Sequence, residues 1–134
     1  MKEILKTLKE DKYIYDIFKD NIWFFQYPQV GKVRTPYIVI DEIDDQMPII
    51  HGSNERIVYS HLIQIDVFVP SSKSYRAYDV CKETSLYISE LLFKKLNIKN
   101  TSSSKPEFSE EYQIHRRARR YEKASFFNGG IKYG

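Results

Sequence analysis

The sequence predicts an α+β domain, in which a sheet of about four mainly antiparallel strands packs against two helices as a two-layer sandwich. One observation is the order of periodic segments along the chain: helix, strand, strand, strand, helix, strand. Placing both helices on one face of the sheet buries one side of every element most economically. The other observation is the length of 134 residues, which suits one core, so residues 1–134 are expected to form a single domain.

The first helix is predicted over residues 3–19. Its apolar residues recur every three or four positions, which is typical of an amphipathic helix, and a break is expected near Asp11. The apolar positions are Ile4, Leu5, Leu8, Ile14, Ile17 and Phe18.

Three strands are predicted next. Residues 22–28 (IWFFQYP) are aromatic and end in proline, and residues 36–43 (PYIVIDEI) are β-branched. After an expected polar loop at 44–55, residues 56–70 (RIVYSHLIQIDVFVP) give the strongest strand pattern in the chain. Alternate residues from Ile57 to Val69 form a mainly apolar face, and Pro70 ends the strand because it cannot donate to the ladder.

The second half of the chain predicts one helix and one strand. A helix is expected over residues 75–96, with the serines of SSKS as its N-terminal cap. Residues 97–110 are rich in Ser, Asn and Lys, contain Pro106, and are expected to form a loop. The last strand is predicted at 112–121, and residues 123–134 are expected to be a flexible tail.

Composition excludes several classes of protein. Apolar residues make up 42% and charged residues 29% of the chain, as in soluble globular domains, and no segment reaches the roughly 20 apolar residues that span a bilayer. The N-terminus lacks the apolar core of a signal peptide. A single cysteine, Cys81, excludes an internal disulfide and is expected to be buried. The net charge of +3 is too small to indicate nucleic-acid binding.

Charge is instead separated by segment. Residues 112–122 (YQIHRRARRYE) hold four arginines in five positions, whereas residues 41–45 (DEIDD) hold four acids and no base. Such segregation suggests complementary surfaces. The candidate interface residues are Arg116, Arg117, Arg119, Arg120, Asp41, Glu42, Asp44 and Asp45.

The arginines need partners. On a strand, Arg116 and Arg120 share one face, and Arg117 and Arg119 share the other. Burying an unpaired guanidinium costs several kcal/mol, so acidic partners are expected. The acids at 41–45 are the candidates, either in the same subunit or in a neighbouring one.

Several alternatives fit these segments. The arginine strand could be a solvated basic face, or it could contact DNA phosphates. The acidic run could hold a hard cation. A metal-dependent nuclease could use Asp66, but no Glu-x-Lys follows on a pairing strand. Because His51, His61 and His115 are isolated and no nucleophile has a nearby base, we expect no enzyme activity, metal site or cofactor.

Four segments together resemble a known family. PYIVIDEI, LIQIDVFVP, YDVCKETSLYISELL and YQIHRRARRYE are similar to the tail completion proteins of long-tailed bacteriophages (siphophages), also called tail terminators or head-to-tail joining proteins. The resemblance covers roughly residues 22–122. Its most specific parts are IDVF at 65–68 and RRARRYE at 116–122.

The resemblance implies a structural virion protein that catalyses no reaction. Six copies would form a ring that caps the tail tube and joins the tail to the DNA-filled head. The implied partners are other copies of the chain, the tail tube protein and the head completion or neck protein, with transient proximity to double-stranded DNA in the channel and no membrane. The implied location is the virion, after assembly in the host cytoplasm.

Two readings of the arginines follow from this resemblance. They face a neighbouring subunit, or they face the channel, where phosphate attraction would slow DNA ejection. Contact with a neighbouring subunit is the favoured reading. The alternative function is a small nucleic-acid-binding module that uses the Arg116–Arg120 strand.

Overall fold

The structure, a computed structural model, describes residues 2–24, 28, 33–50, 57–128 and 131–133, and side chains in these ranges except at 44–50, 57–61, 124–128 and 131–133. The described residues form three helices, α1 (Lys2–Glu10), α2 (Lys12–Phe18) and α3 (Ala77–Leu96). They also form seven strands: β1 (Ile22–Phe24), β2 (Tyr37–Ile50), β3 (Ile57–Pro70), β4 (Lys99–Ser103), β5 (Glu107–Ser109), β6 (Ile114–Asn128) and β7 (Ile131–Tyr133).

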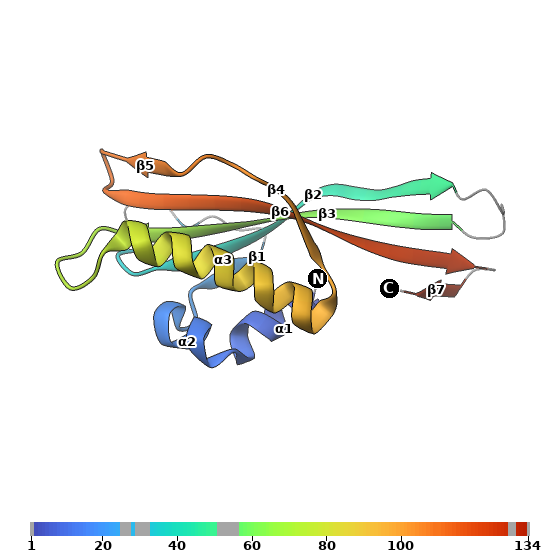
Figure 1. Cartoon of the computed structure of the whole chain (residues 1–134), viewed down its shortest axis with the longest axis horizontal. Helices are drawn as coiled ribbons and strands as arrows, with labels where there is room; N and C mark the ends of the chain where they lie inside the picture. The colour runs from blue at the N-terminus through green and yellow to red at the C-terminus, as the bar shows by residue number, and fades with distance from the viewer. Residues whose placement is uncertain (1, 25–27, 29–32, 51–56, 129–130, 134) are drawn as a thin grey trace.

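All seven strands belong to one sheet in the order β1-β2-β3-β6-β4, and β5 and β7 also pair with β6. Every pairing is antiparallel except β1 with β2, so the sheet is mixed. The helices lie on one face of it (Figure 1). The α+β class is confirmed, and the described chain has one more helix and more strands than expected.

The extra helix comes from the expected break at Asp11. The Asp11 side chain accepts a hydrogen bond from the Ile14 backbone N–H at 3.1 Å, which caps the start of α2. Its other carboxylate oxygen accepts from the Tyr87 hydroxyl of α3 at 2.8 Å. One residue therefore ends the first helix, starts the second and attaches both to the third.

Strand β2 is longer than predicted. It continues through residues 44–50, which were expected to be a loop, and pairs with β3 as far as Ile50 and Ile57. The register shifts between Glu42 and Asp44 and again between Asp44 and Met47. These irregularities break the alternation of apolar and polar residues, which is why the sequence reads as a loop there.

Two predictions were wrong in the second half, and the last strand is longer than predicted. The predicted loop at 97–110 contains the two short edge strands β4 and β5. β4 is exposed along its whole length, which explains why its residues are polar. The serines do not cap α3: its N-cap is Arg76, which makes no side-chain cap bond, and Ser72 instead accepts from the Ser74 N–H at 3.0 Å. Strand β6 extends into the expected tail, through Asn128.

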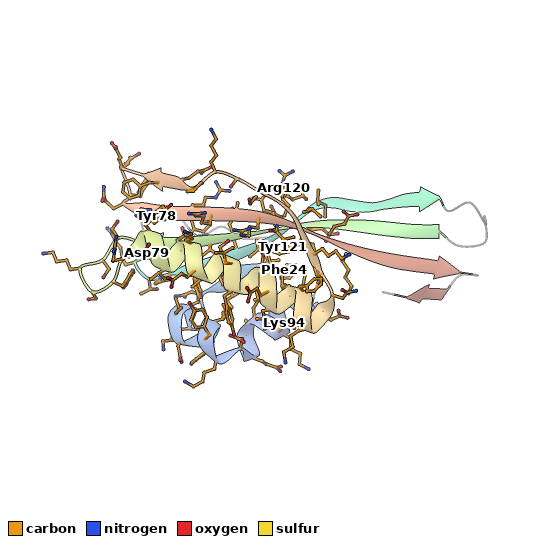
Figure 2. All side chains as sticks on the ribbon, viewed as in Figure 1. Phe24, Tyr78, Asp79, Lys94, Arg120 and Tyr121 are labelled. Atoms are coloured by element: carbon orange, nitrogen blue, oxygen red, sulfur yellow. The ribbon has the colours of Figure 1, made fainter. Side chains whose placement is uncertain are left out.

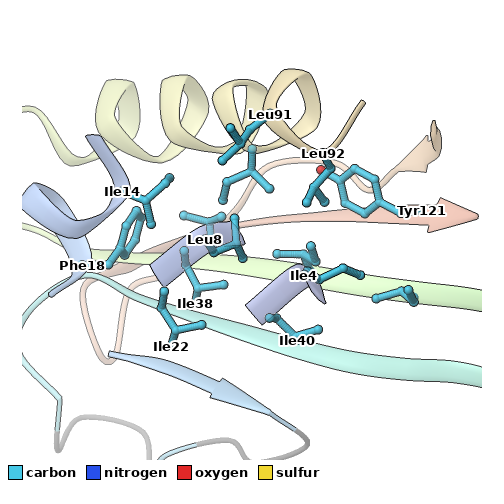
Figure 3. Packing of buried hydrophobic residues seen from close by; sticks show 14 of the residues in the cluster. Ile4, Leu8, Ile14, Phe18, Ile22, Ile38, Ile40, Leu91, Leu92 and Tyr121 are labelled. Carbon is cyan, nitrogen blue, oxygen red and sulfur yellow. The ribbon is translucent and has the colours of Figure 1, made fainter. Parts of the chain in front are cut away.

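The described core lies between the helices and the sheet (Figure 3). Ile4 and Leu8 of α1 and Phe18 of α2 pack with Leu92 of α3, and all four side chains are at most 1% exposed. The sheet contributes alternate residues of β3, namely Ile63, Ile65, Val67 and Val69. They confirm the predicted apolar face from residue 63 onward; the side chains of Ile57, Tyr59 and His61 lie outside the described part.

One end of the sheet extends beyond the helices. β2, β3 and β6 run on past the end of α3, toward the right of Figure 1, and β7 pairs with the last residues of β6. We call this part the arm; it comprises residues 44–50, 57–61, 124–128 and 131–133. The described helices pack against the rest of the same strands. No helix among the described residues is long and apolar enough to cross a membrane.

Candidate interaction surface on strand β6

The four arginines lie on β6 with the predicted alternation. Arg119 contacts α3 and Arg117 contacts Tyr78, so both lie on the helix-covered face. Arg116 and Arg120 lie on the opposite face, which we call the open face. Figure 2 shows the labelled Arg120 pointing away from the helix layer and Tyr121 pointing toward it.

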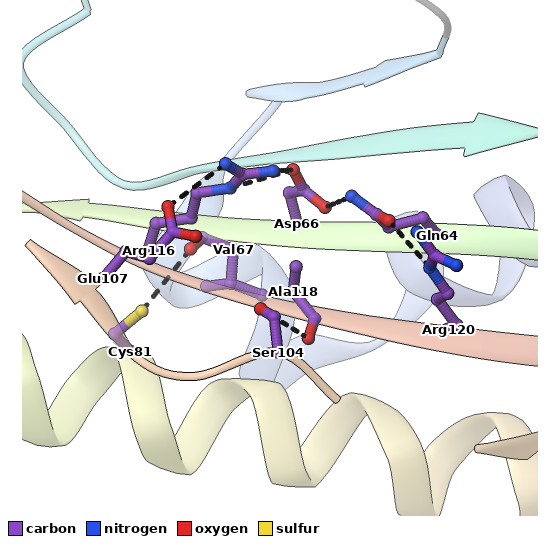
Figure 4. A network of polar contacts seen from close by, with 9 residues as sticks. All are labelled: Gln64, Asp66, Val67, Cys81, Ser104, Glu107, Arg116, Ala118 and Arg120. Carbon is purple, nitrogen blue, oxygen red and sulfur yellow. Dashed lines mark hydrogen bonds and ion pairs between the residues drawn. The ribbon is translucent and has the colours of Figure 1, made fainter. Parts of the chain in front are cut away.

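Arg116 pairs with a carboxylate of the long strand β3. Its Nε and Nη2 donate to Asp66 Oδ2 at 3.1 and 2.6 Å (Figure 4). The Asp66 side chain is 1% exposed, and that of Arg116 is 33% exposed. In the register of β3 with β6, Ala118 lies opposite Asp66. Because the Ala118 side chain is small, it leaves room for the Arg116 guanidinium beside Asp66. The expectation of an acidic partner is confirmed for Arg116.

This pair is the centre of a chain of polar contacts across the open face. The Gln64 amide donates to Asp66 Oδ1 at 2.8 Å, and Gln64 Oε1 accepts from Arg120 Nε at 3.3 Å. At the other end, Arg116 Nη1 donates to Glu107 of β5 at 3.3 Å. Two carboxylates therefore neutralise Arg116, whereas Arg120 contacts a neutral amide.

On the helix-covered face, the arginines bind neutral groups of α3 and β4. Arg119 donates from Nε to Ser85 Oγ and from Nη1 to Asn100 Oδ1, both at 2.9 Å. Arg117 stacks over the Tyr78 ring, with 5.4 Å from guanidinium carbon to ring centre. These contacts attach β6 to the helix layer.

The acidic segment lies two strands away from the arginines. The register aligns Asp41 of β2 with Gln64 of β3, and Gln64 with Arg120 of β6. Since β3 lies between them, Asp41 and Arg120 are separated by about 10 Å across the sheet. Asp41 and Glu42 are half-buried at the start of the arm. The side chains of Asp44 and Asp45 lie outside the described part of the chain.

Asp66 is not arranged as a metal ligand. Its carboxylate is buried and already accepts three hydrogen bonds, from Arg116 and Gln64. Among the side chains that the structure describes, no three His, Cys, Asp or Glu residues come together as a metal-binding group.

Two adjoining pockets flank Arg116 on the open face. One has a volume of about 320 Å³, and four of its eight lining residues are aromatic; we call it the aromatic pocket. The other, the polar pocket, has a volume of about 370 Å³. Arg116 and Glu107 line both, so their ion pair forms the shared wall. The aromatic pocket is lined by Tyr37, Phe68, Phe108, Tyr112 and Ile114, and the polar pocket by Gln64, Ser102, Ser103, Ser104, Ala118 and Arg120.

Burial changes the titration of groups beneath this surface. It raises the pKa of the Tyr121 phenol, whose oxygen lies 2.9 Å from Ser89 Oγ. It lowers the pKa of His115, whose ring lies between Phe108 and Tyr78. Burial therefore favours the neutral form of both side chains.

Cys81 is expected to be inert in the folded protein. Burial raises the pKa of its thiol to about 12, and Sγ donates to the Val67 carbonyl at 3.4 Å. The thiolate fraction at pH 8 is therefore roughly a thousandfold lower than for a free cysteine. We expect a chromogenic disulfide reagent to label the chain rapidly only in denaturant. Equal labelling rates with and without denaturant would contradict the buried placement.

The sequence missed the residues that contact the arginines. Gln64, Ser85, Asn100 and Glu107 carry no local signal, because each lies on another element. Asp66 had one signal, since it is the only acid within the apolar run of residues 57–70. A carboxylate in such a strand requires a partner.

Comparison of the chain with protein-family models and with curated protein sequences finds no match.

Proposed function

We propose that this chain is a structural protein of a long-tailed bacteriophage, which caps the tail tube as a ring and joins the tail to the DNA-filled head. Six copies form the ring, the number that the resemblance implies. It acts by assembly and catalyses no reaction. Its partners are other copies of itself, the tail tube protein and a neck protein. Support comes from the resemblance of residues 22–122 and from the shape of the fold.

The arm is the observation that carries the proposal. It is an antiparallel ribbon that leaves the helix-covered body, and its sequence includes the apolar runs MPII at 47–50 and IVY at 57–59. A ribbon of a few strands gains little stability by itself and needs a further surface to pack against. A neighbouring subunit of a ring supplies such a surface at every position.

Charge at the base of the arm supports the same assembly. The acids Asp41 and Glu42 lie where β2 leaves the helix-covered body, with Asp44 and Asp45 following along the strand. Arg120 is exposed on the open face of β6. A head-to-tail ring brings two different surfaces of one chain together, and opposite charges on them favour the correct register.

The nucleic-acid-binding alternative has weaker support. Arg116 is neutralised by Asp66 and Glu107, and Arg119 is engaged with Ser85 and Asn100. Phosphate binding on a strand requires several available cations. Arg120 and the half-buried Arg117 remain as candidates, which is a small basic surface.

The test of the proposal is to disrupt the gene in the phage that carries it and to image the lysate by negative-stain electron microscopy. We expect filled heads beside unjoined or overlong tails. Without the cap, the tail tube would continue to grow, and without the joining protein, heads and tails would stay separate. A plasmid copy of the gene should restore joined virions, which controls for effects on neighbouring genes. Intact virions without the gene product would refute the proposal.

A further inference from the structure

The paired pockets on the open face have features of a binding groove. They lie side by side along β6, with the aromatic pocket near Ile114 and the polar pocket near Ala118 and Arg120. Phe108 is 43% exposed and Tyr112 38% exposed, so the rings at the mouth of the aromatic pocket are accessible. An accessible apolar pocket beside fixed polar groups is typical of a ligand site.

The polar pocket favours a carboxylate. Arg120 donates from Nε to Gln64, and no contact to a described residue engages its two terminal nitrogens. A guanidinium fork binds a carboxylate with two parallel hydrogen bonds. Ser102 and Ser103 line the same pocket, and their hydroxyls can donate to the remaining lone pairs. Ser104 also lines it, but its hydroxyl donates to the Ala118 carbonyl at 3.4 Å.

The neighbouring charges favour a single carboxylate over a polyanion. Asp66 and Glu107 lie on either side of the Arg116 guanidinium, so a chain of phosphates along this face would meet two fixed negative charges. Glu107 lines the polar pocket too, but its carboxylate is paired with Arg116 Nη1 at 3.3 Å, so Arg120 supplies the positive charge for a single acidic side chain. A ring-lined pocket next to the cation fits an apolar or aromatic side chain of the same ligand.

We propose that this groove binds an extended segment of a different protein, with an aromatic side chain in the aromatic pocket and an acidic side chain on Arg120. Arg116, which lines the aromatic pocket, and Arg120, which lines the polar pocket, are four residues apart along β6, which is roughly 13 Å. An extended segment therefore presents the aromatic and the acidic residue four positions apart. The inference does not depend on the proposed function.

A second copy of the chain is a poorer source of this segment. Among the described exposed aromatics outside the groove, Tyr15 adjoins Asp16 and Tyr78 adjoins Asp79. Lys12 pairs with Asp16 at 3.2 Å and Arg76 pairs with Asp79 at 3.1 Å. The two rings are also occupied, because Lys19 lies over the Tyr15 ring and Arg117 over the Tyr78 ring, each at 5.4 Å. These residues also lie in a helix, which shortens their spacing. The acids at 41–45 lie within a paired strand.

The test uses a fluorescein-labelled peptide in which three Gly or Ser residues separate a Phe from a Glu, titrated with the full chain and followed by fluorescence anisotropy. We expect saturable binding that the Arg120→Gln and Phe108→Ala variants each weaken about tenfold or more, as for a lost charge-assisted contact or ring contact. The Lys105→Gln variant is the matched control, because it also removes one exposed positive charge. Lys105 lies between β4 and β5 and lines neither pocket. This variant should bind as the parent chain does.

Several results would overturn the inference. Equal weakening by Arg120→Gln and Lys105→Gln would indicate general charge attraction. If peptides in which Ala replaces Phe, or Gln replaces Glu, bound as tightly as the original peptide, the two pockets would not be the binding site. Binding of a DNA duplex that Arg120→Gln abolishes, without peptide binding, would assign the face to nucleic acid. Self-association that Arg120→Gln disrupts, without peptide binding, would assign it to a second copy.

Discussion

Replacing Asp66 with alanine should lower the free energy of unfolding by about 2–3 kcal/mol. Loss of one partner from a buried ion pair typically costs about 3–5 kcal/mol, and the partial exposure of Arg116 reduces that cost here. The reason is that the guanidinium would lose two hydrogen bonds in a place that water reaches only from one side. Urea unfolding followed by circular dichroism measures the change.

Two variants separate this pair from the rest of the open face. Glu107→Gln removes the exposed partner of Arg116 and should cost less than about 1 kcal/mol, as surface ion pairs do. The double variant Asp66→Leu, Arg116→Met should recover most of the stability, because it buries no unpaired charge. A cost for Glu107→Gln as large as that for Asp66→Ala would contradict the assigned geometry.

The Asp66 pair also changes how charge-reversal experiments on this strand should be read. Arg116→Glu would place a second negative charge against a buried carboxylate and should unfold the domain. Arg120→Glu changes an exposed side chain that makes one hydrogen bond, to Gln64. Loss of assembly in the Arg120→Glu variant would therefore indicate an interface role for Arg120. In the Arg116→Glu variant the same loss could result from unfolding.

Ending the chain after Lys123 should abolish head-to-tail joining and leave the domain folded. The described core cluster runs from Ile4 to Tyr121, so the deletion removes none of its members. It does remove the β6 and β7 part of the arm, which spans 124–128 and 131–133. The proposed ring would lose a surface at every subunit contact at once.

The measurement is complementation of a phage that lacks the gene, scored by infectious particles and by electron microscopy. The truncated chain should give no joined virions, while its far-ultraviolet spectrum and cooperative melting remain close to those of the parent. Full complementation by the truncated chain would show that this part of the arm is not needed for joining. Loss of cooperative melting would show instead that the arm supports the core, contrary to the separation of the two in the fold.

Local pattern in the sequence determined a good part of the fold. The alternation from Ile57 to Pro70 and the helical spacing of residues 75–96 act through neighbours in the chain, so they were readable without tertiary information. The break at Asp11 was readable for the same reason, since its cap bond reaches only three residues. The split of four arginines between two faces of β6 followed from the two-residue period of a strand.

Only the tertiary structure decided the lengths of the edge strands and the partners of the arginines. Strands β4 and β5 carry no apolar alternation because they gain their hydrogen bonds from β6 and expose their side chains. Asp66 and Arg116 are 50 residues apart, and Glu107 reaches Arg116 because β5 pairs with the start of β6. Which carboxylate meets which guanidinium depends on strand order and register, and both are set by the packing of the whole chain.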